Sequence, residues 1–102
     1  MSTSCVIAVK LFNDSYIATV CNFDGYYDGV GAELREHFTD IGAPQKLVEG
    51  GEIRCINKGE VEYYAKSNFK PVTMNEKELA GMRSEWGCSY THLYVAGEWV
   101  TL

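Results

Sequence analysis

The chain has 102 residues, 46% hydrophobic and 23% charged, and this balance predicts one folded domain, residues 1–102, rather than a disordered chain. Its formal net charge of −5 and its scattered basic residues argue against direct nucleic-acid binding, which requires clustered Lys and Arg. No apolar run approaches the roughly 18 residues that span a bilayer, and the first residues lack a signal peptide's pattern, so we expect no membrane partner and a cytoplasmic location.

Two β-rich runs begin the chain. Residues 4–11 and 16–23 are short and rich in β-branched side chains, which is typical of strands. Asn13 and Asp14 lie between them and provide turn chemistry, because their side chains can bond nearby backbone groups. The two runs therefore predict a β-hairpin.

Two helices are predicted after a glycine-rich loop at residues 24–31. Asp28 is the predicted N-cap of the first helix. A second, short helix is expected over residues 44–49, with Pro44 in its first turn. Four apolar residues recur at spacings of four, four and three, which places them on one face of the first helix: Val30, Leu34, Phe38 and Ile41.

The middle of the second half combines short strands with a third helix. Residues 53–56 and 61–65 predict strands separated by a turn. Thr73 and Glu76 have the spacing of a capping box and predict a helix that follows them, ending near Glu85.

The C-terminal residues predict a second hairpin and complete the fold. Residues 88–95 alternate with the period of a strand, residues 96–97 form a tight turn, and residues 98–102 return. The whole pattern predicts an α+β fold. We expect one sheet of about five mostly antiparallel strands, with two to three helices packed on one of its faces.

The loop at residues 24–31 is the most informative candidate site. Gly25, Gly29 and Gly31 lie between a strand and a helix, an arrangement that exposes backbone N–H groups at a helix N-terminus, where anions bind. Their spacing matches neither the dinucleotide fingerprint nor a Walker loop, and the acidic Asp24 and Asp28 oppose a phosphate. A purely structural role, in which glycine permits close packing, is the alternative interpretation.

Aromatic and charged side chains extend this candidate site. Tyr26 and Tyr27 lie on the loop and can stack on a base or a partner protein. Arg35 lies about one helical turn beyond the loop, within reach of it. Tyr63 and Tyr64 alternate on a strand, so one of them must leave the core. The expected ligand- or partner-binding residues are Asp24, Gly25, Tyr26, Tyr27, Gly29, Gly31, Arg35 and Tyr63.

Metal binding and catalysis have thin support. Cys88 and His92, four residues apart, are the nearest approach to a zinc ligand pair. For nucleophilic catalysis a cysteine could act with His37 or His92, and Cys21 is the best candidate, but no strained-turn signature accompanies it. We expect no cofactor, no metal and no catalytic residue. The four cysteines are small buried hydrophobes in this interpretation, although their even count also permits two disulfides: Cys5, Cys21, Cys55 and Cys88.

A block found in small proteins of bacteriophages and prophages resembles residues 21–38, which read Cys-Asn-Phe-Asp-Gly-Tyr-Tyr-Asp-Gly-Val-Gly-Ala-Glu-Leu-Arg-Glu-His-Phe. The shared features are an aromatic-Asp-Gly-Tyr, a Gly-Val-Gly, and then a helix with Leu and a His-aromatic pair. Weaker similarity extends over residues 15–56 and 88–102. The resemblance implies a phage origin and action in the host bacterial cytoplasm, where small accessory phage proteins commonly act on host machinery.

Three functional hypotheses follow. The first is a phage-type accessory protein that binds and inhibits a host defence protein without catalysis. The second is a sponge that sequesters a small phosphorylated nucleotide in the glycine-rich loop. The third, and least favoured, is a small hydrolase or transferase. A homo-oligomer that shares a pocket between two chains is also open.

Overall fold

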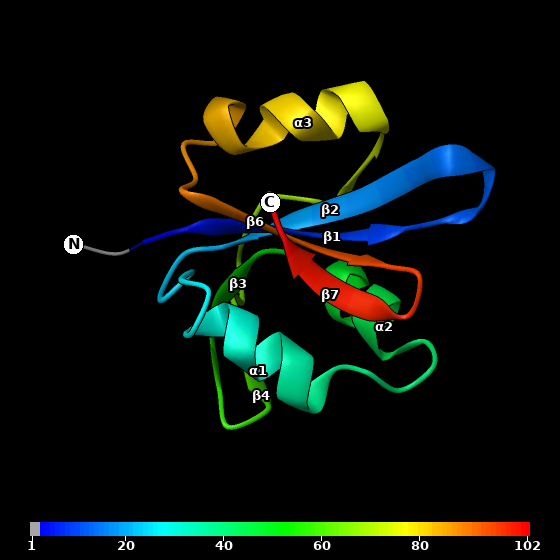
Figure 1. Cartoon of the computed structure of the whole chain (residues 1–102). Coiled ribbons are helices and arrows are strands. Elements are labelled where there is room, and N and C mark those ends of the chain that lie inside the picture. The colour runs from blue at the N-terminus through cyan, green and yellow to red at the C-terminus, as the bar shows by residue number, and fades with distance from the viewer. Residues whose placement is uncertain (1–2) are drawn as a thin grey trace.

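The computed structural model describes residues 3–102 as a seven-stranded sheet with helices on both faces (Figure 1). A one-turn 3-10 helix, Phe12–Asp14, joins the first two strands. The strand order is β4-β3-β2-β1-β6-β7, and β5 pairs with β2 outside this path. In chain order the elements are β1 (Cys5–Lys10), β2 (Ser15–Cys21), α1 (Val30–His37), α2 (Ala43–Glu49), β3 (Ile53–Asn57), β4 (Glu60–Tyr63), β5 (Val72–Asn75), α3 (Glu76–Glu85), β6 (Tyr90–Val95) and β7 (Glu98–Thr101).

The sheet is mixed. Four of its pairings are antiparallel, including the predicted β1–β2 and β6–β7 hairpins. β1 with β6 and β2 with β3 are parallel. The α+β class is confirmed, and the sheet has seven strands where we expected about five. The longest helix, α3, has 10 residues, and none of the helices within residues 3–102 could cross a membrane.

The helices lie on both faces of the sheet, so the expectation that they pack on one face is wrong. α1 and α2 cover one face and α3 covers the other (Figure 1). Side chains alternate along β1: Cys5 and Ile7 face α1 and α2, whereas Val6 and Ala8 face α3. The first five residues of β1 are buried, as expected for a central strand that is covered on both sides.

Each face carries its own apolar cluster. The cluster beneath α1 and α2 contains Cys5, Ile7, Val9, Cys21, Val30, Leu34, Leu47, Val48, Ile53, Ile56 and Trp99. The cluster beneath α3 contains Val6, Ala8, Tyr16, Ala18, Met74, Leu79, Met82 and Leu93. Both clusters share the central strands β1 and β2, so the two layers are packed around one sheet.

Two expectations about α1 are wrong. Gly29, and not Asp28, occupies the N-cap position, and no side chain caps this end of the helix. The helix ends at His37, so Ile41 lies beyond it and is fully exposed. The chain turns away at Gly42, whose φ of 82° starts α2.

The capping box of α3 lies two residues later than predicted. Asn75 accepts from the Glu78 N–H, and Glu78 Oε1 accepts from the Asn75 N–H. Thr73 is instead paired with Ile17, because residues 72–75 form β5 against β2. β5 runs directly into α3, so the sequence contains no turn that separates the strand from the helix. The polar residues at the end of β5 were therefore interpreted as the start of the helix.

Candidate functional site

The glycine-rich loop lies at the end of the sheet where β1 and β6 begin, between β2 and α1 (Figure 1). Gly25 donates its N–H to Thr3 O at 2.8 Å, and a Cβ at this position would lie 2.9 Å from the Cβ of Cys5. A Cβ at Gly29 would overlap the carbonyl oxygen of Asp24. These contacts are closer than any other residue type can make without displacing backbone.

Three backbone N–H groups at the end of the loop are used within the loop. Gly29 and Gly31 both donate to the carbonyl oxygen of Tyr26, at 3.1 Å, and Val30 donates to Asp24 O at 2.8 Å. The expected anion cradle requires these N–H groups to be free. In this arrangement the glycines permit close packing, which is the structural interpretation of the motif.

His92 holds the loop from the sheet, and it was not among the predicted site residues. Its side chain is 1% exposed. Nε2 lies 2.9 Å from Gly25 O and Nδ1 lies 2.8 Å from Thr101 Oγ1. Because a carbonyl oxygen only accepts, Nε2 carries the proton and Nδ1 accepts from the Thr101 hydroxyl. Burial, and to a smaller extent the nearby Arg35 guanidinium, lower the pKa of His92 and favour this neutral form.

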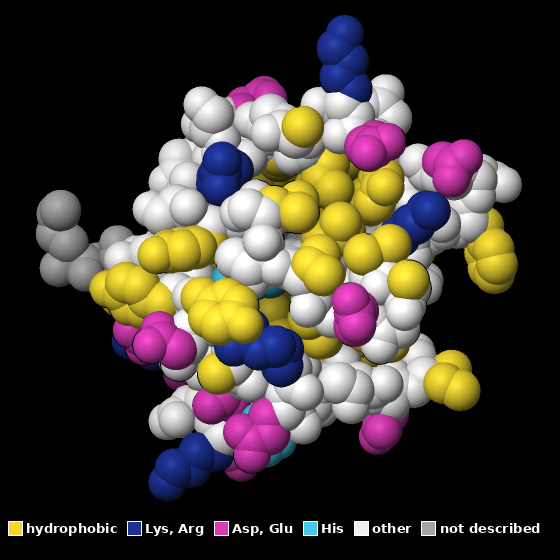
Figure 2. Space-filling model, in the orientation of Figure 1, with side chains coloured by type: hydrophobic (Ala, Val, Ile, Leu, Met, Phe, Trp, Pro, Cys, Tyr) yellow, Lys and Arg dark blue, Asp and Glu magenta, His cyan; other side chains and the backbone are white. Residues whose placement is uncertain are grey.

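An aromatic–arginine surface covers the outside of the loop; we define it as Phe23, Tyr26, Tyr27, Arg35 and Arg54. The three rings are 38%, 42% and 56% exposed. The Arg35 Cζ lies 3.9 Å from the centroid of the Tyr27 ring, and its Nη2 donates to Tyr27 O at 2.8 Å. The Arg54 Cζ lies 5.1 Å from the centroid of the Phe23 ring. Figure 2 shows hydrophobic side chains gathered with basic groups on this side of the molecule.

The exposed rings are connected to the core. The ring of Tyr26 meets the ring of Tyr90 edge-on, at 6.3 Å between centroids. Tyr90 is stacked parallel to the buried His92, at 6.2 Å. A Cβ at Gly31 would lie 3.0 Å from Arg35 Nη1 and 3.1 Å from His92 Cε1, so glycine allows both side chains to approach. The surface is therefore supported by fixed neighbours.

The acidic residues of the loop line a shallow hollow beside this surface. It has a volume of about 350 Å³ and is lined by Asp24, Tyr26, Asp28, Gly29, Ala32, Glu33, Ile56 and Asn57. Three carboxylates, those of Asp24, Asp28 and Glu33, give it negative charge, which disfavours a phosphate. Glu33 is also bound to the backbone, since it accepts the Gly59 N–H at 2.8 Å.

Tyr63 is not part of this site. It lies on β4 and packs over Gly50, and its hydroxyl donates to Leu47 O at 2.7 Å. Burial raises the pKa of its phenol. The structure therefore brings together Asp24, Gly25, Tyr26, Tyr27, Gly29, Gly31 and Arg35, and it places Tyr63 against α2.

The candidate catalytic groups have separate surroundings. Cys21 is buried opposite Cys5 in the β1–β2 register, and its Sγ lies 3.7 Å from Phe23 O. A hydrogen bond to Cys21, together with burial, raises the pKa of Cys5. His37 lies 3.9 Å from both Glu33 and Glu36. Among residues 3–102 the structure contains no group of three His, Cys, Asp or Glu residues that could hold a metal ion.

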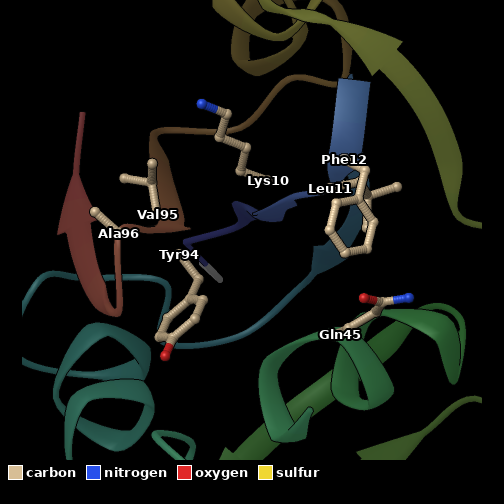
Figure 3. A pocket seen from close by; sticks show the side chains of 7 residues that line it. All are labelled: Lys10, Leu11, Phe12, Gln45, Tyr94, Val95 and Ala96. Carbon is tan, nitrogen blue, oxygen red and sulfur yellow. The ribbon is translucent and has the colours of Figure 1, made fainter. Parts of the chain in front are cut away.

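A second hollow lies at the opposite end of the sheet, and no sequence motif indicated it. This hairpin-end groove has a volume of about 290 Å³ and is lined by Lys10, Leu11, Phe12, Gln45, Tyr94, Val95 and Ala96 (Figure 3). Phe12 is 90% exposed and lies in the one-turn helix between β1 and β2. Figure 3 shows that the groove is formed between this hairpin, α2 and the β6–β7 turn.

Comparison of the chain with protein-family models, with curated proteins and with solved structures finds no match. The resemblance to small phage and prophage proteins therefore stays a prediction, and it is carried by residues 21–38.

Proposed function

We propose that this chain is a phage-type accessory protein that acts by binding, without turnover, and that it inhibits a host defence protein. The aromatic–arginine surface is the observation that carries the binding proposal. The phage-type origin and the host target rest on the resemblance of residues 21–38.

The composition of this surface favours a protein partner. Phe23, Tyr26 and Tyr27 are exposed within five consecutive positions. Aromatic residues and arginine are enriched in the parts of protein interfaces that contribute most binding energy. The Tyr27 ring and the Arg35 side chain already contact each other at 3.9 Å. Side chains that are ordered before binding lose less conformational entropy when a partner arrives.

The charge around the surface favours a basic partner. Asp24 and Asp28 are exposed beside the aromatic rings, and the whole chain carries a formal charge of −5. Opposite charge on the partner would accelerate association. We therefore expect the association rate to fall as salt is added, because ions screen exposed charges over about 10 Å at 0.1 M ionic strength.

The nucleotide hypothesis is less well supported. The amides of Gly29, Val30 and Gly31 donate within the loop, and the adjoining hollow carries Asp24 and Asp28. A ligand at 100 times its dissociation constant stabilises the folded state by about 2.7 kcal/mol. We expect no such stabilisation in thermal-shift measurements with mono-, di- and cyclic nucleotides, and a clear upward shift with any of them would contradict this.

The binding proposal is tested by quantitative capture from bacterial lysates. Wild type, Tyr27→Ala, Arg35→Gln and the control Phe12→Ala are immobilised at equal density after thermal unfolding has shown that each is folded. We expect one host protein to be retained by wild type and by Phe12→Ala, and to be depleted at least about tenfold, or 1.4 kcal/mol, by Tyr27→Ala and Arg35→Gln.

The proposed inhibition is tested with the captured host protein after it has been purified. The activity of the host protein should fall when the wild-type chain is added and should persist when Tyr27→Ala is added. Equal retention by Tyr27→Ala and wild type would contradict the assigned surface. Failure to retain any host protein from the lysates would contradict the binding function itself.

A further inference from the structure

The strand β7 forms one open edge of the sheet, because the strand order begins at β4 and ends at β7. Val95 pairs with Glu98 across the two-residue turn, and Leu102 donates its N–H to Thr91 O at 2.8 Å. In an antiparallel pair the residues alternate between bonding inward and pointing outward. The N–H and C=O groups of Trp99 and Thr101 therefore point away from β6, toward the open edge.

The two ends of the strand order, β4 and β7, differ in their protection against pairing. β4 has four residues, two of which are Glu60 and Glu62, and its pairing with β3 contains a register shift. Charged residues and irregular pairing are the usual means of preventing another strand from adding to an edge. β7 carries a single charge, on Glu98, and its pairing with β6 is regular. Of the two ends of the strand order, β7 is the one that is open to another strand.

We propose that a second copy of this chain adds to β7 in antiparallel orientation, with the twofold axis at Val100. Trp99 of each copy then lies opposite Thr101 of the other, and their outward N–H and C=O groups form four hydrogen bonds. An axis at Trp99 would use only the central pair, because Thr101 would lie opposite the turn. A twofold axis between two residues would place the outward N–H and C=O groups of one copy opposite residues whose own groups point inward to β6. The register at Val100 satisfies both outward residues.

Charge complementarity favours a second copy as the occupant. In this register Glu98 of one copy lies opposite Leu102 of the other, on the face of the sheet that α3 covers. Arg83 of α3 donates to Leu102 O at 3.0 Å, so its guanidinium is held at that position. The twofold axis forms two such Glu98–Arg83 pairs, one at each end of the shared strands.

The apolar residues of the same face are continuous with this contact. Val100 faces its own symmetry copy, and Val95 and Val100 pack at the margin of the cluster beneath α3. Figure 2 shows hydrophobic side chains gathered between α3 and β7 on the visible face. Directly opposed apolar side chains in a non-hydrogen-bonded antiparallel pair are close together, which strengthens such pairs. These residues differ from the aromatic–arginine surface, and so the dimer and the proposed function are tested independently.

The test is a charge exchange, read as molar mass by light scattering and sedimentation between about 10 µM and about 1 mM, where weak dimers form. We expect wild type to dimerise within this range. Glu98→Arg and Arg83→Glu should each weaken the dimer by about tenfold or more, and the double variant E98R/R83E should restore it. The control Glu60→Arg, on the opposite edge, should dimerise as wild type does.

Amide hydrogen exchange locates the contact. The N–H groups of Trp99 and Thr101 should exchange more slowly as protein concentration rises, whereas that of Val61, which points outward from β4, should not change. A monomer throughout the concentration range would overturn the proposal, and so would a dimer that the charge exchange leaves unaffected. If β7 instead accepts a strand from another protein, the isolated chain stays monomeric and both amides exchange at one rate at every concentration.

Discussion

The two ends of the sheet both expose aromatic side chains, but they support them differently. At the loop end, Tyr27 contacts Arg35, and the loop beneath them is fixed by hydrogen bonds to Thr3 and to His92. At the hairpin end, Phe12 is more exposed, at 90%, and belongs to a single helical turn. Among the aromatic side chains, exposure alone would select Phe12 as the binding residue.

The two ends therefore differ in whether neighbouring residues hold the exposed aromatic side chains in place. An isolated exposed apolar side chain is common on soluble proteins and needs no function. Exposed aromatic rings that each contact an arginine, as Tyr27 contacts Arg35 and Phe23 contacts Arg54, combine apolar area, charge and low conformational entropy, which is the composition of interface hot spots. We therefore expect the loop end to be the rigid end, and the hairpin end to be dispensable for stability and for binding.

The largest expected effect is the loss of close packing at Gly25. In Gly25→Ala the new methyl group would lie 2.9 Å from the Cβ of Cys5 and from the carbonyl carbon of Ser4. Overpacking of this kind lowers the free energy of unfolding by about 1–3 kcal/mol. Urea unfolding measures it. The control Gly81→Ala has open space in α3 and should be stabilised by up to about 1 kcal/mol; equal effects at both glycines would contradict the account.

The second effect is the removal of the buried histidine. His92→Leu leaves the Gly25 carbonyl and the Thr101 hydroxyl without their partner. An unsatisfied buried polar group costs about 1–3 kcal/mol, so we expect a loss of about 2 kcal/mol in denaturant unfolding. His37→Leu is the matched control on the surface, and should change stability by less than about 0.5 kcal/mol. Equal losses in the free energy of unfolding for His92→Leu and His37→Leu would contradict the claim that His92 holds the loop.

The third effect is a pH dependence that His92 contributes. Its folded-state pKa is lowered, so the unfolded state binds more protons as the pH falls below the ordinary histidine pKa of about 6.5. The free energy of unfolding should therefore decrease on acidification from about pH 7 toward the lowered pKa, with a slope of at most about 1.4 kcal/mol per pH unit. Unfolding at several pH values measures this slope, which His92→Leu should remove and His37→Leu should retain.

The smallest effect is expected at the hairpin end. Phe12→Ala should change the free energy of unfolding by less than about 0.5 kcal/mol, because the side chain is 90% exposed. Tyr27→Ala removes one cation–π contact and should cost about 0.5–1 kcal/mol. Chemical denaturation of the two variants compares them directly. If Phe12→Ala lowered the free energy of unfolding more than Tyr27→Ala, the hairpin end and not the loop end would be the better ordered one.

Local patterns in the sequence predicted the elements better than their arrangement. The spacing of Val30 and Leu34 predicted α1, and the turn residues at Asn13 and Asp14 predicted the first hairpin. The unbroken apolar run of β1, residues 5–9, is the signal that could have shown a sheet covered on both faces. β5 was missed because its four residues immediately precede α3.

The sequence indicated which loop residues form the candidate site, but it did not indicate which residues hold that loop in place. Residues 24–31 were singled out because glycines between a strand and a helix can expose backbone N–H groups at a helix N-terminus, but the N–H groups of Gly29, Val30 and Gly31 donate within the loop. Position 25 requires glycine because Ser4 and Cys5 approach it closely, and its backbone is held by hydrogen bonds to Thr3 and His92. These residues are distant in the chain and come together only when β1 and β6 pair. His92 gave no sequence signal for this role, because a histidine on a strand is equally compatible with surface, metal and core positions.

The central claim is that the aromatic–arginine surface contacts the partner, and hydroxyl-radical footprinting of the captured complex tests it most directly. Phe12 and Tyr27 are both exposed and both react with the radical, so each protein molecule contains its own comparison. We predict that binding slows the labelling of Phe23, Tyr26 and Tyr27 and leaves Phe12 unchanged. Protection of Phe12 with unchanged labelling of Tyr27 would contradict the claim.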